Sequence, residues 1–374
     1  MNRDGLSGIK RVVVKVGSSS ITHPTGKLNF AQVERLVRQL ADLHNQDYQV
    51  ILVSSGAVGA GMGKLGLKQR PKNIPEKQAL AAVGQGLLMH MYEKMFAEYG
   101  QTVAQILLTK EDMADRRRFL NARTALLTLL NFGVIPIINE NDTVAVEEIK
   151  FGDNDTLSAM VASLADADLL VILSDIDGLY TANPHSDSTA QLISLVEEIT
   201  PEIEQIAGGA GSGLGTGGMV TKLQAAKIAM NSGVAMVIGH GRDEGILGKI
   251  VAGEEVGTLF MPKESPLHCK KRWIAFGSNI QGKLIIDDGA QEVLQKAGKS
   301  LLAIGITDVQ GSFDMGNAVG VYNYNGLEIA RGIVNYSSCE IEKIKGVRTT
   351  EIASILGYKD YDEVIHRDNL VLCG

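Results

Sequence analysis

Short, nearly continuous apolar runs alternate along the first two thirds of the chain with segments whose apolar residues repeat at helical spacing. Runs rich in β-branched residues are typical of parallel strands that are buried on both faces. They occur at residues 11–16, 49–53, 103–108, 134–138, 168–173 and 234–238. Helical periodicity follows at residues 30–43, 76–99, 118–132 and 156–164, and in the segment that follows Lys222 as far as Asn231. This alternation predicts a three-layer α/β fold around a doubly wound, mostly parallel sheet with right-handed crossovers.

The pattern changes after residue 262. From Trp273 onward, short alternating stretches are separated by turns, and helices are expected at residues 292–297 and 349–356. The alternating stretches are residues 282–286, 300–306, 318–324 and 327–334. Asn325-Gly326 between the last two is a strong hairpin signal. We therefore predict a first domain over residues 1–262, a linker over 263–272, and a small β-rich barrel over 273–374.

Polar residues interrupt the first domain where its predicted strands end. Lys15 lies two residues before Gly17, and Ser55 and Gly56 directly follow the second strand. The carboxyl ends of parallel strands form the ligand-binding edge of an open sheet. An unpaired ammonium group in a buried strand is strongly destabilising. Lys15 therefore faces an anion or a cleft, unless it belongs to an edge strand and extends its ammonium group to solvent.

Two acidic clusters lie at neighbouring strand–helix junctions. Residues 139–142 (Asn-Glu-Asn-Asp) follow the fourth strand, and residues 152–155 (Gly-Asp-Asn-Asp) precede the next predicted helix. Asp and Asn are favoured helix N-caps, so one of these acids is expected to cap. Capping does not require two clusters, and carboxylate together with amide oxygens suits the amino group of a zwitterion.

Glycine is densest in residues 208–218, directly before a predicted helix that carries Lys222 on its first turn. A loop of this kind can turn its backbone N–H groups toward a phosphate, although many Gly/Ser-rich segments are flexible surface loops. Neither a G-x-G-x-x-G motif after the first strand nor a G-x-x-x-x-G-K-[ST] motif is present. Lys15 and Lys222 could bracket a transferred phosphoryl group, with Asp155 between them.

Composition narrows the function classes. The 374 residues carry a net charge of −7, and the barrel region from Lys270 onward holds 12 basic and 13 acidic residues. Neither value favours nucleic acid as a partner. The three cysteines, Cys269, Cys339 and Cys373, have no metal-ligand spacing. The N-terminus lacks an apolar leader, and no apolar run approaches the length of a membrane span, so a cytoplasmic protein with reduced thiols is expected.

Six stretches of the first domain resemble the amino-acid kinase family, in the branch that carries a C-terminal PUA module. They are residues 12–19, 54–61, 138–142, 152–155, 174–181 and 215–226. The second domain resembles the PUA module through Phe313, Gly316, Val319, Gly326, Ile329, Ala330 and Gly332. Ser54 and Ser174 stand where threonine is common in the family, which keeps a hydroxyl group at both positions.

The resemblance implies ATP-dependent phosphorylation of the γ-carboxylate of L-glutamate to glutamate 5-phosphate, the first step toward proline. Lys15 and Lys222 would then assist the transfer, and Asp155 would organise them. The implied glutamate contacts are Ser55, Gly56, Asp142, Asp153 and Asn154. The implied ATP contacts are Lys15, Ser174, Asp175, Thr216, Gly217, Gly218, Met219, Val220, Thr221 and Lys222. Mg²⁺ would be held mainly through the ATP phosphates rather than by dedicated protein ligands.

The same resemblance implies L-proline as a feedback inhibitor, a homodimer or homotetramer, and a glutamyl-phosphate reductase that uses the product. Aspartate, acetylglutamate and nucleoside monophosphates are alternative substrates on the same scaffold. A different class of function is an RNA-associated regulator that acts through the PUA-like barrel, for which the near-neutral charge of the barrel gives no support.

Overall fold

The computed structural model describes residues 6, 8–23, 25, 27–67, 69, 71, 73–145, 154–184, 187–208, 218–263 and 280–373, without the side chains of residues 116 and 117. The chain forms two compact units: residues 1–112 with 117–266 belong to the first, and residues 267–374 belong to the second. The predicted linker, residues 263–272, lies outside the described residues except for its first position. Its boundaries therefore stay a prediction.

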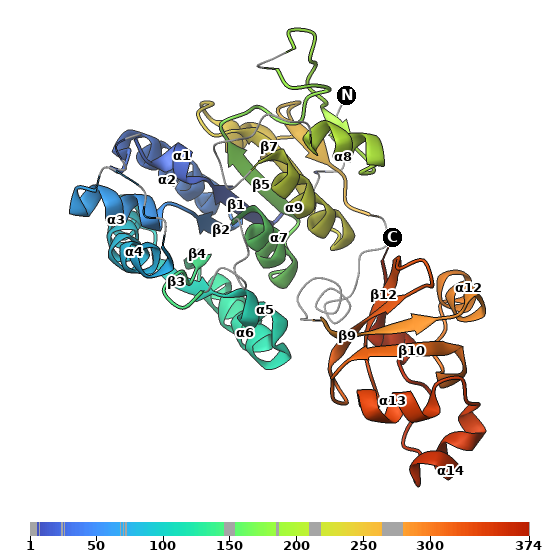
Figure 1. Cartoon of the computed structure of the whole chain (residues 1–374). Helices are drawn as coiled ribbons and strands as arrows, with labels where there is room; N and C mark the ends of the chain where they lie inside the picture. The colour runs from blue at the N-terminus through green and yellow to red at the C-terminus, as the bar shows by residue number, and fades with distance from the viewer. Residues whose placement is uncertain are drawn as a thin grey trace. The chain divides into compact units, whose positions relative to one another are not determined.

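The first unit is built on an eight-stranded sheet with the strand order β3-β4-β2-β1-β5-β7-β8-β6 (Figure 1). The strands are β1 (Arg11–Val16), β2 (Gln49–Ser54), β3 (Val103–Leu108), β4 (Ile135–Glu140), β5 (Leu169–Ser174), β6 (Leu195–Val196), β7 (Ala235–His240) and β8 (Thr258–Phe260). Each neighbouring pair is parallel except β7 with β8. The predicted doubly wound, mostly parallel sheet is confirmed.

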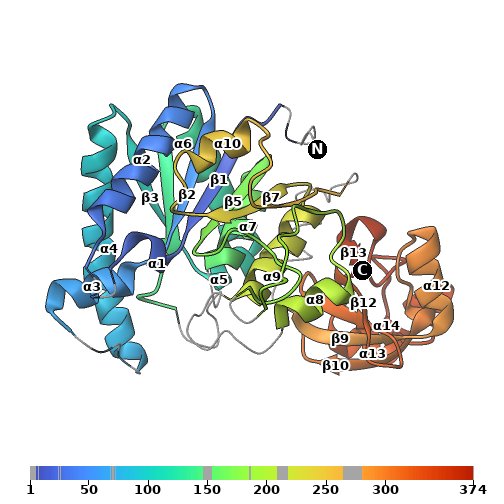
Figure 2. The same ribbon diagram turned by 90° about the horizontal axis from the view of Figure 1, so that it is seen from above.

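Helices cover both faces of this sheet. They are α1 (Ser18–Ile21), α2 (Phe30–Asn45), α3 (Ala57–Leu65), α4 (Ile74–Ala97), α5 (Lys110–Ala114), α6 (Arg116–Asn131), α7 (Asn154–Leu164), α8 (Pro201–Gly208), α9 (Met219–Asn231) and α10 (Ile246–Val251). Figure 2 shows α2 and α10 on one side of the strands, with α7 and α9 side by side on the other. None of the described helices is long and apolar enough to cross a membrane.

The alternation of side chains along β1 decides which residue faces which layer. Val12, Val14 and Val16 belong to the core that α2, α4 and α10 cover. Successive side chains of a strand point to opposite faces, so Val13 and Lys15 face the other layer, on the side of α7 and α9. All of β1 beyond Arg11 is buried, and Lys15 is therefore a cation inside the fold.

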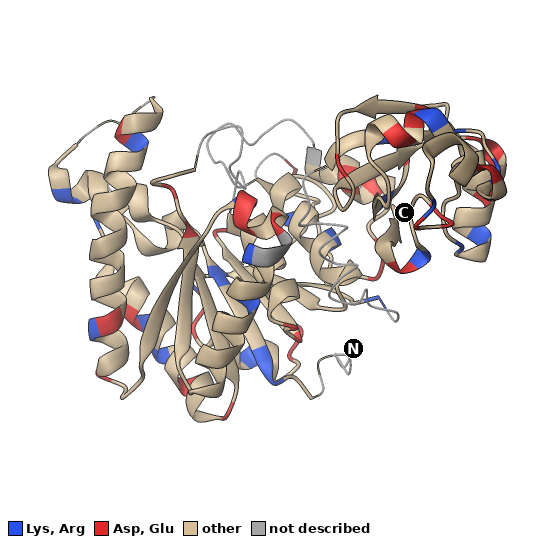
Figure 3. Ribbon diagram, turned by 90° about the horizontal axis from the view of Figure 1, so that it is seen from below, with Lys and Arg blue, Asp and Glu red and all other residues tan. Residues whose placement is uncertain are grey.

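The second unit is a five-stranded sheet with the order β10-β9-β11-β12-β13. Its elements are β9 (Ile280–Ile286), α12 (Asp288–Ala297), β10 (Ile306–Gly311), β11 (Ala318–Tyr322), β12 (Glu328–Ile333), α13 (Ser338–Ile344), α14 (Ile352–Leu356) and β13 (Leu370–Leu372). β11 and β12 form the predicted hairpin, with Gly326 at φ +77° in its turn. Figure 3 shows basic and acidic residues intermingled on this unit.

Two local predictions were wrong, and one helix was not predicted. α7 begins at Asn154 rather than at residue 156, so Asn154 and Asp155 lie on its first turn and not in the preceding loop. The strand expected at residues 300–306 is instead a single bridge at Leu301 and a 3₁₀ turn, because Gly305 lies against the Ala290 side chain. α13 was missed, although Ser337 and Glu340 form a capping box at its start.

Two glycines bring α3 and α4 into backbone contact. A Cβ atom on Gly84 would lie 1.7 Å from the Ala57 carbonyl oxygen, and one on Gly61 would lie 2.1 Å from the Leu80 carbonyl oxygen. Helices approach this closely only where glycine removes the side chain. Since α3 begins directly after the β2 end, this contact holds α4 beside the loop at Ser55.

We expect Gly84→Ala to lower the free energy of unfolding by about 1–3 kcal/mol, because the added methyl group forces the two helices apart. Gly86→Ala is the matched control in the same helix, where a Cβ meets no atom within 4 Å. It should raise stability by about 0.5–1 kcal/mol through helix propensity. Urea unfolding followed by circular dichroism measures both variants. Equal effects would show that close packing at Gly84 is not a constraint.

Candidate functional site

The candidate site lies where β1, β2, β4 and β5 end and α7 and α9 begin. The registers set Val16 of β1 beside Ser54 of β2 and Leu173 of β5, so these strand ends form one edge. Parallel sheets of this kind bind ligands at their carboxyl edge, where the strand order switches direction. Here the chain runs from β1 to β2 on one side and later returns to β5 on the other.

A buried carboxylate joins two buried lysines at this edge. Asp155 Oδ1 lies 2.5 Å from Lys15 Nζ, and Asp155 Oδ2 lies 3.1 Å from Lys222 Nζ. Asp155 is fully buried, while Lys15 and Lys222 are each 5% exposed. Thr221 also contacts this carboxylate, with its hydroxyl 3.1 Å from Oδ2. The three ionised groups carry a net charge of +1 in a poorly solvated place, which favours an anionic ligand.

Helix geometry brings these groups together. Asp155 is on the first turn of α7, Lys222 is on the first turn of α9, and the two helices pack against each other. A first helical turn has free N–H groups and a positive dipole end, and Gly218 is the N-cap of α9. Both helix starts therefore add positive potential beside the lysines.

A chain of side-chain hydrogen bonds lies next to this cluster and runs from Ser55 through Asn154 and Asn139 to Gln85. The Asn154 amide nitrogen donates to the Ser55 hydroxyl at 2.8 Å and to Asn139 Oδ1 at 2.9 Å. The Asn139 amide nitrogen donates in turn to Gln85 Oε1 at 2.9 Å. Both N–H donors of Asn154 are thereby used, so its carbonyl oxygen is the group it can offer to a ligand.

Ser54 turns its hydroxyl toward the core. Its Oγ lies 2.8 Å from the Tyr92 hydroxyl, and both residues are buried. Burial raises the pKa of Tyr92 to about 12. Tyr92 therefore stays a neutral hydrogen-bond partner that ties α4 to the end of β2.

The structure brings together Lys15, Asp155 and Lys222, and separately Ser55 and Asn154. Gly56 follows with φ +103° as the N-cap of α3, and Asp142 is half-buried two residues after β4. Asp153, Thr216 and Gly217 lie outside the described residues.

The remaining residues of the predicted ATP set lie on the same strand edge or on α9. Ser174 ends β5, is buried, and donates to Asp175 Oδ1 at 3.1 Å. The start of α9 holds Gly218, Met219, Val220, Thr221 and Lys222. Sequence reasoning named Asn139 only as part of a polar cluster, and it missed Gln85. A glutamine within a helical repeat carries no local signal of a contact with a distant strand.

The fold and the lysine–carboxylate–lysine cluster at the sheet edge define the class of α/β protein only broadly, and family models specify it. The model described as "Amino acid kinase family" matches residues 10–240. The model described as "PUA domain" matches residues 282–356. The chain belongs to the amino acid kinase family and carries a PUA domain after the kinase domain.

Curated relatives over nearly the whole chain share one more specific name. A protein of Caldanaerobacter subterraneus subsp. tengcongensis named "Glutamate 5-kinase" is 59% identical over 97% of both chains. Proteins with the same name from Carboxydothermus hydrogenoformans and Moorella thermoacetica are 59% and 57% identical, over 99% and 100% of this chain and 99% and 98% of theirs. Within its family, the chain thus groups with the glutamate 5-kinases.

We expect Asp155→Asn to be far more destabilising than Lys222→Met. The first change removes the carboxylate charge that both buried ammonium groups contact and should cost about 3–5 kcal/mol, as when one partner of a buried ion pair is removed. The second leaves Lys15 and Asp155 as a matched pair and should cost less than about 1.5 kcal/mol. Urea unfolding at pH 7 measures both. A Lys222→Met variant at least as unstable as Asp155→Asn would contradict this account of the cluster.

Proposed function

We propose that this chain transfers the γ-phosphoryl group of ATP to the γ-carboxylate of L-glutamate, giving glutamate 5-phosphate and ADP. The observation that carries the proposal is the buried cluster in which Asp155 holds Lys15 and Lys222 at the strand ends. The name shared by relatives that are 57–59% identical over almost the full chain supports glutamate as the acceptor.

The proposed reaction requires one bond to form and one bond to break. A γ-carboxylate oxygen forms a bond to the γ-phosphorus, the bond from that phosphorus to the β–γ bridging oxygen breaks, and ADP leaves with the electron pair. The glutamate carboxylate is ionised near neutral pH, so no general base is needed. Catalysis then consists of positioning and of neutralising charge on the phosphoryl oxygens.

The two lysines meet these demands from opposite sides of the carboxylate. In our proposal, Lys15 and Lys222 neutralise the transferred group and the leaving diphosphate, and Asp155 is a positioning residue that holds both ammonium groups. ATP would lie along Ser174, Asp175 and the start of α9. Because the lysines come from different elements, a phosphoryl group between them is held by the scaffold rather than by a single loop.

The proposed glutamate contacts are argued from the hydrogen bonds of Asn154. With its N–H groups committed to Ser55 and Asn139, Asn154 presents a carbonyl oxygen that would accept a hydrogen bond from the substrate ammonium. Ser55, Gly56, Asp142 and Asp153 complete the proposed glutamate contacts by resemblance to the family.

The side chains of the candidate site would supply only some of the ligands of a Mg²⁺ ion. Both oxygens of Asp155 already face ammonium groups, so we propose that the phosphate oxygens of ATP would supply most ligands of the ion. When bound, Mg²⁺ would neutralise phosphate charge. Inhibition by L-proline, a homodimer or homotetramer, and a downstream glutamyl-phosphate reductase rest on the resemblance and stay predictions. A cytoplasmic location rests on the sequence composition and also stays a prediction.

We expect glutamate alone to stimulate ADP release among L-glutamate, L-aspartate, N-acetyl-L-glutamate and UMP. Lys222→Ala should lose at least about 100-fold in kcat, because a charge contact to the transferred group disappears, while its circular dichroism spectrum stays unchanged. A coupled ADP assay measures both. Stimulation by another acceptor overturns the assigned substrate, and near-normal turnover of Lys222→Ala overturns the two-lysine mechanism.

We expect Gln85→Leu to raise the KM for glutamate about tenfold with little change in the KM for ATP, because Asn139 loses its acceptor and no longer holds Asn154 in one orientation. Gln85→Glu keeps an acceptor oxygen and should recover most of the affinity. Gln101→Leu removes a comparable hydrogen bond to Asn45 (2.7 Å) outside the site and is the control. Steady-state kinetics decide: a loss in kcat alone, or equal effects of all three variants, contradicts a positioning role for Gln85.

A further inference from the structure

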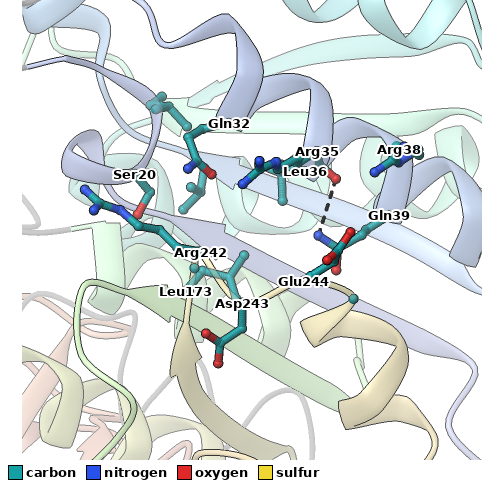
Figure 4. Close-up of a pocket in the computed structure, with 14 residues that line it drawn as sticks. Ser20, Gln32, Arg35, Leu36, Arg38, Gln39, Leu173, Arg242, Asp243 and Glu244 are labelled. Carbon is teal, nitrogen blue, oxygen red and sulfur yellow. Dashed lines mark hydrogen bonds between the residues drawn. The ribbon is translucent and has the colours of Figure 1, made fainter.

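A second hollow lies at the ends of the same strands but on the opposite face of the sheet, between α2 and the loop after β7 (Figure 4). Including the part open to solvent, it has a volume of about 490 Å³. Val16, Ile21, Leu36 and Leu173 supply buried apolar lining. Since Lys15 points to the α7 and α9 face, this hollow is separate from the candidate active site.

Ser20, Gln32, Arg35 and Arg242 place hydrogen-bond donors along this hollow, and the exposed Arg38 lines it as well. Ser20 and Gln32 are half-buried, and Arg35 and Arg242 are exposed. None of the four side chains makes a hydrogen bond or ion pair with another residue that the structure describes. Figure 4 shows Ser20 with Arg242 on the side of the loop, and Gln32 with Arg35 on α2. Donors that come from three elements form a set that an oxyanion can satisfy.

Gln39, Asp243 and Glu244 also line the hollow. Gln39 accepts from the Leu247 backbone N–H at 3.1 Å and donates to the Arg35 carbonyl oxygen at 3.3 Å. Asp243 Oδ1 lies 3.7 Å from His240 Nδ1. In Figure 4 the Asp243 carboxylate points away from Ser20 and Arg35, and Glu244 lies beside Gln39. The end of the hollow near Ser20 is therefore cationic.

One backbone hydrogen bond joins the lining of this hollow to Ser174, a residue of the proposed ATP contacts. The Gly241 N–H donates to the Ser174 carbonyl oxygen at 2.8 Å. A Cβ atom on Gly241 would lie 3.3 Å from Ser20 Oγ and 3.4 Å from Leu173 Cβ, so glycine keeps the space between them open. A ligand that orders the loop after β7 would act on Ser174 through this contact.

We propose that this hollow is a binding site for a small oxyanion, a phosphate or carboxylate group held by Arg35 and Arg242 with Ser20 and Gln32 as further donors. The site takes one anionic head group, and a short apolar part of the ligand packs on Leu36 and Leu173. It is distinct from the proposed ATP and glutamate positions and does not depend on the reaction.

The test is calorimetric titration of the full chain with inorganic phosphate or acetate at constant ionic strength set by NaCl, with the active site filled by a non-hydrolysable ATP analogue, Mg²⁺ and glutamate. We expect saturable binding of at least one anion to the wild type. The variant Arg35→Gln/Arg242→Gln should bind at least tenfold more weakly. Lys249→Gln, which removes an exposed positive charge on the nearby α10 helix, should bind like the wild type.

Which anion saturates the hollow separates a phosphate site from a carboxylate site. Equal binding by the wild type and the double variant overturns the proposal, as does a loss of affinity in Lys249→Gln that matches the double variant, since that would reflect general charge attraction. Absence of saturable binding of either anion overturns it as well. Glutamate kinase activity has no bearing on these outcomes, so failure of the proposed reaction would be seen separately.

Discussion

The structure depends on one carboxylate placed between two buried ammonium groups. Without Asp155, Lys15 and Lys222 would repel each other in surroundings that solvate neither. Their attraction to one carboxylate requires the end of β1 and the starts of α7 and α9 to meet within about a hydrogen-bond length. This electrostatic requirement therefore fixes the relation between the central strand and the layer that covers one face of the sheet. The same arrangement places two ammonium groups side by side, which suits a phosphoryl group.

Burial keeps this arrangement rigid. Every residue of α7 except Thr156 is buried, so the helix cannot rotate or slide without opening the core. Asn154 and Asp155 are consecutive on its first turn and therefore serve different partners: Asp155 faces the lysines, and Asn154 faces Ser55 and Asn139. A single helix start thus supports both halves of the site. On the far side, the glycine contact between α3 and α4 places Gln85 within reach of Asn139.

The chemistry of individual residues decides which parts of the fold and of the candidate site can be predicted from the sequence. Buried parallel strands contain continuous apolar runs, and polar residues at their ends must share one edge, so the sheet and residues such as Lys15 and Ser55 could be predicted. The start of α7 could not, because Asn154 and Asp155 suit a cap and a helical first turn equally. Gln85 could not be found, because its partner is on a strand more than fifty residues away. Residues 300–306 alternate like a strand, but packing of Gly305 on α12 overrides that pattern.

The strand order accounts for two binding surfaces at one edge. The strand β2 lies on one side of β1, and β5 lies on the other, so the chain connections diverge at this point of the sheet. Diverging connections leave the space above the strand ends uncovered by crossover helices. On the α7 and α9 face, that space is lined by lysines whose charge is organised by Asp155. On the α2 face, it is lined by arginines that no described carboxylate pairs with. Val16 and Leu173 separate the two by the thickness of a single sheet, and the backbone hydrogen bond from Gly241 to Ser174 is a short connection between them. The proposed anion site and the candidate reaction site therefore lie at the same strand edge, and the backbone hydrogen bond from Gly241 to Ser174 joins their linings.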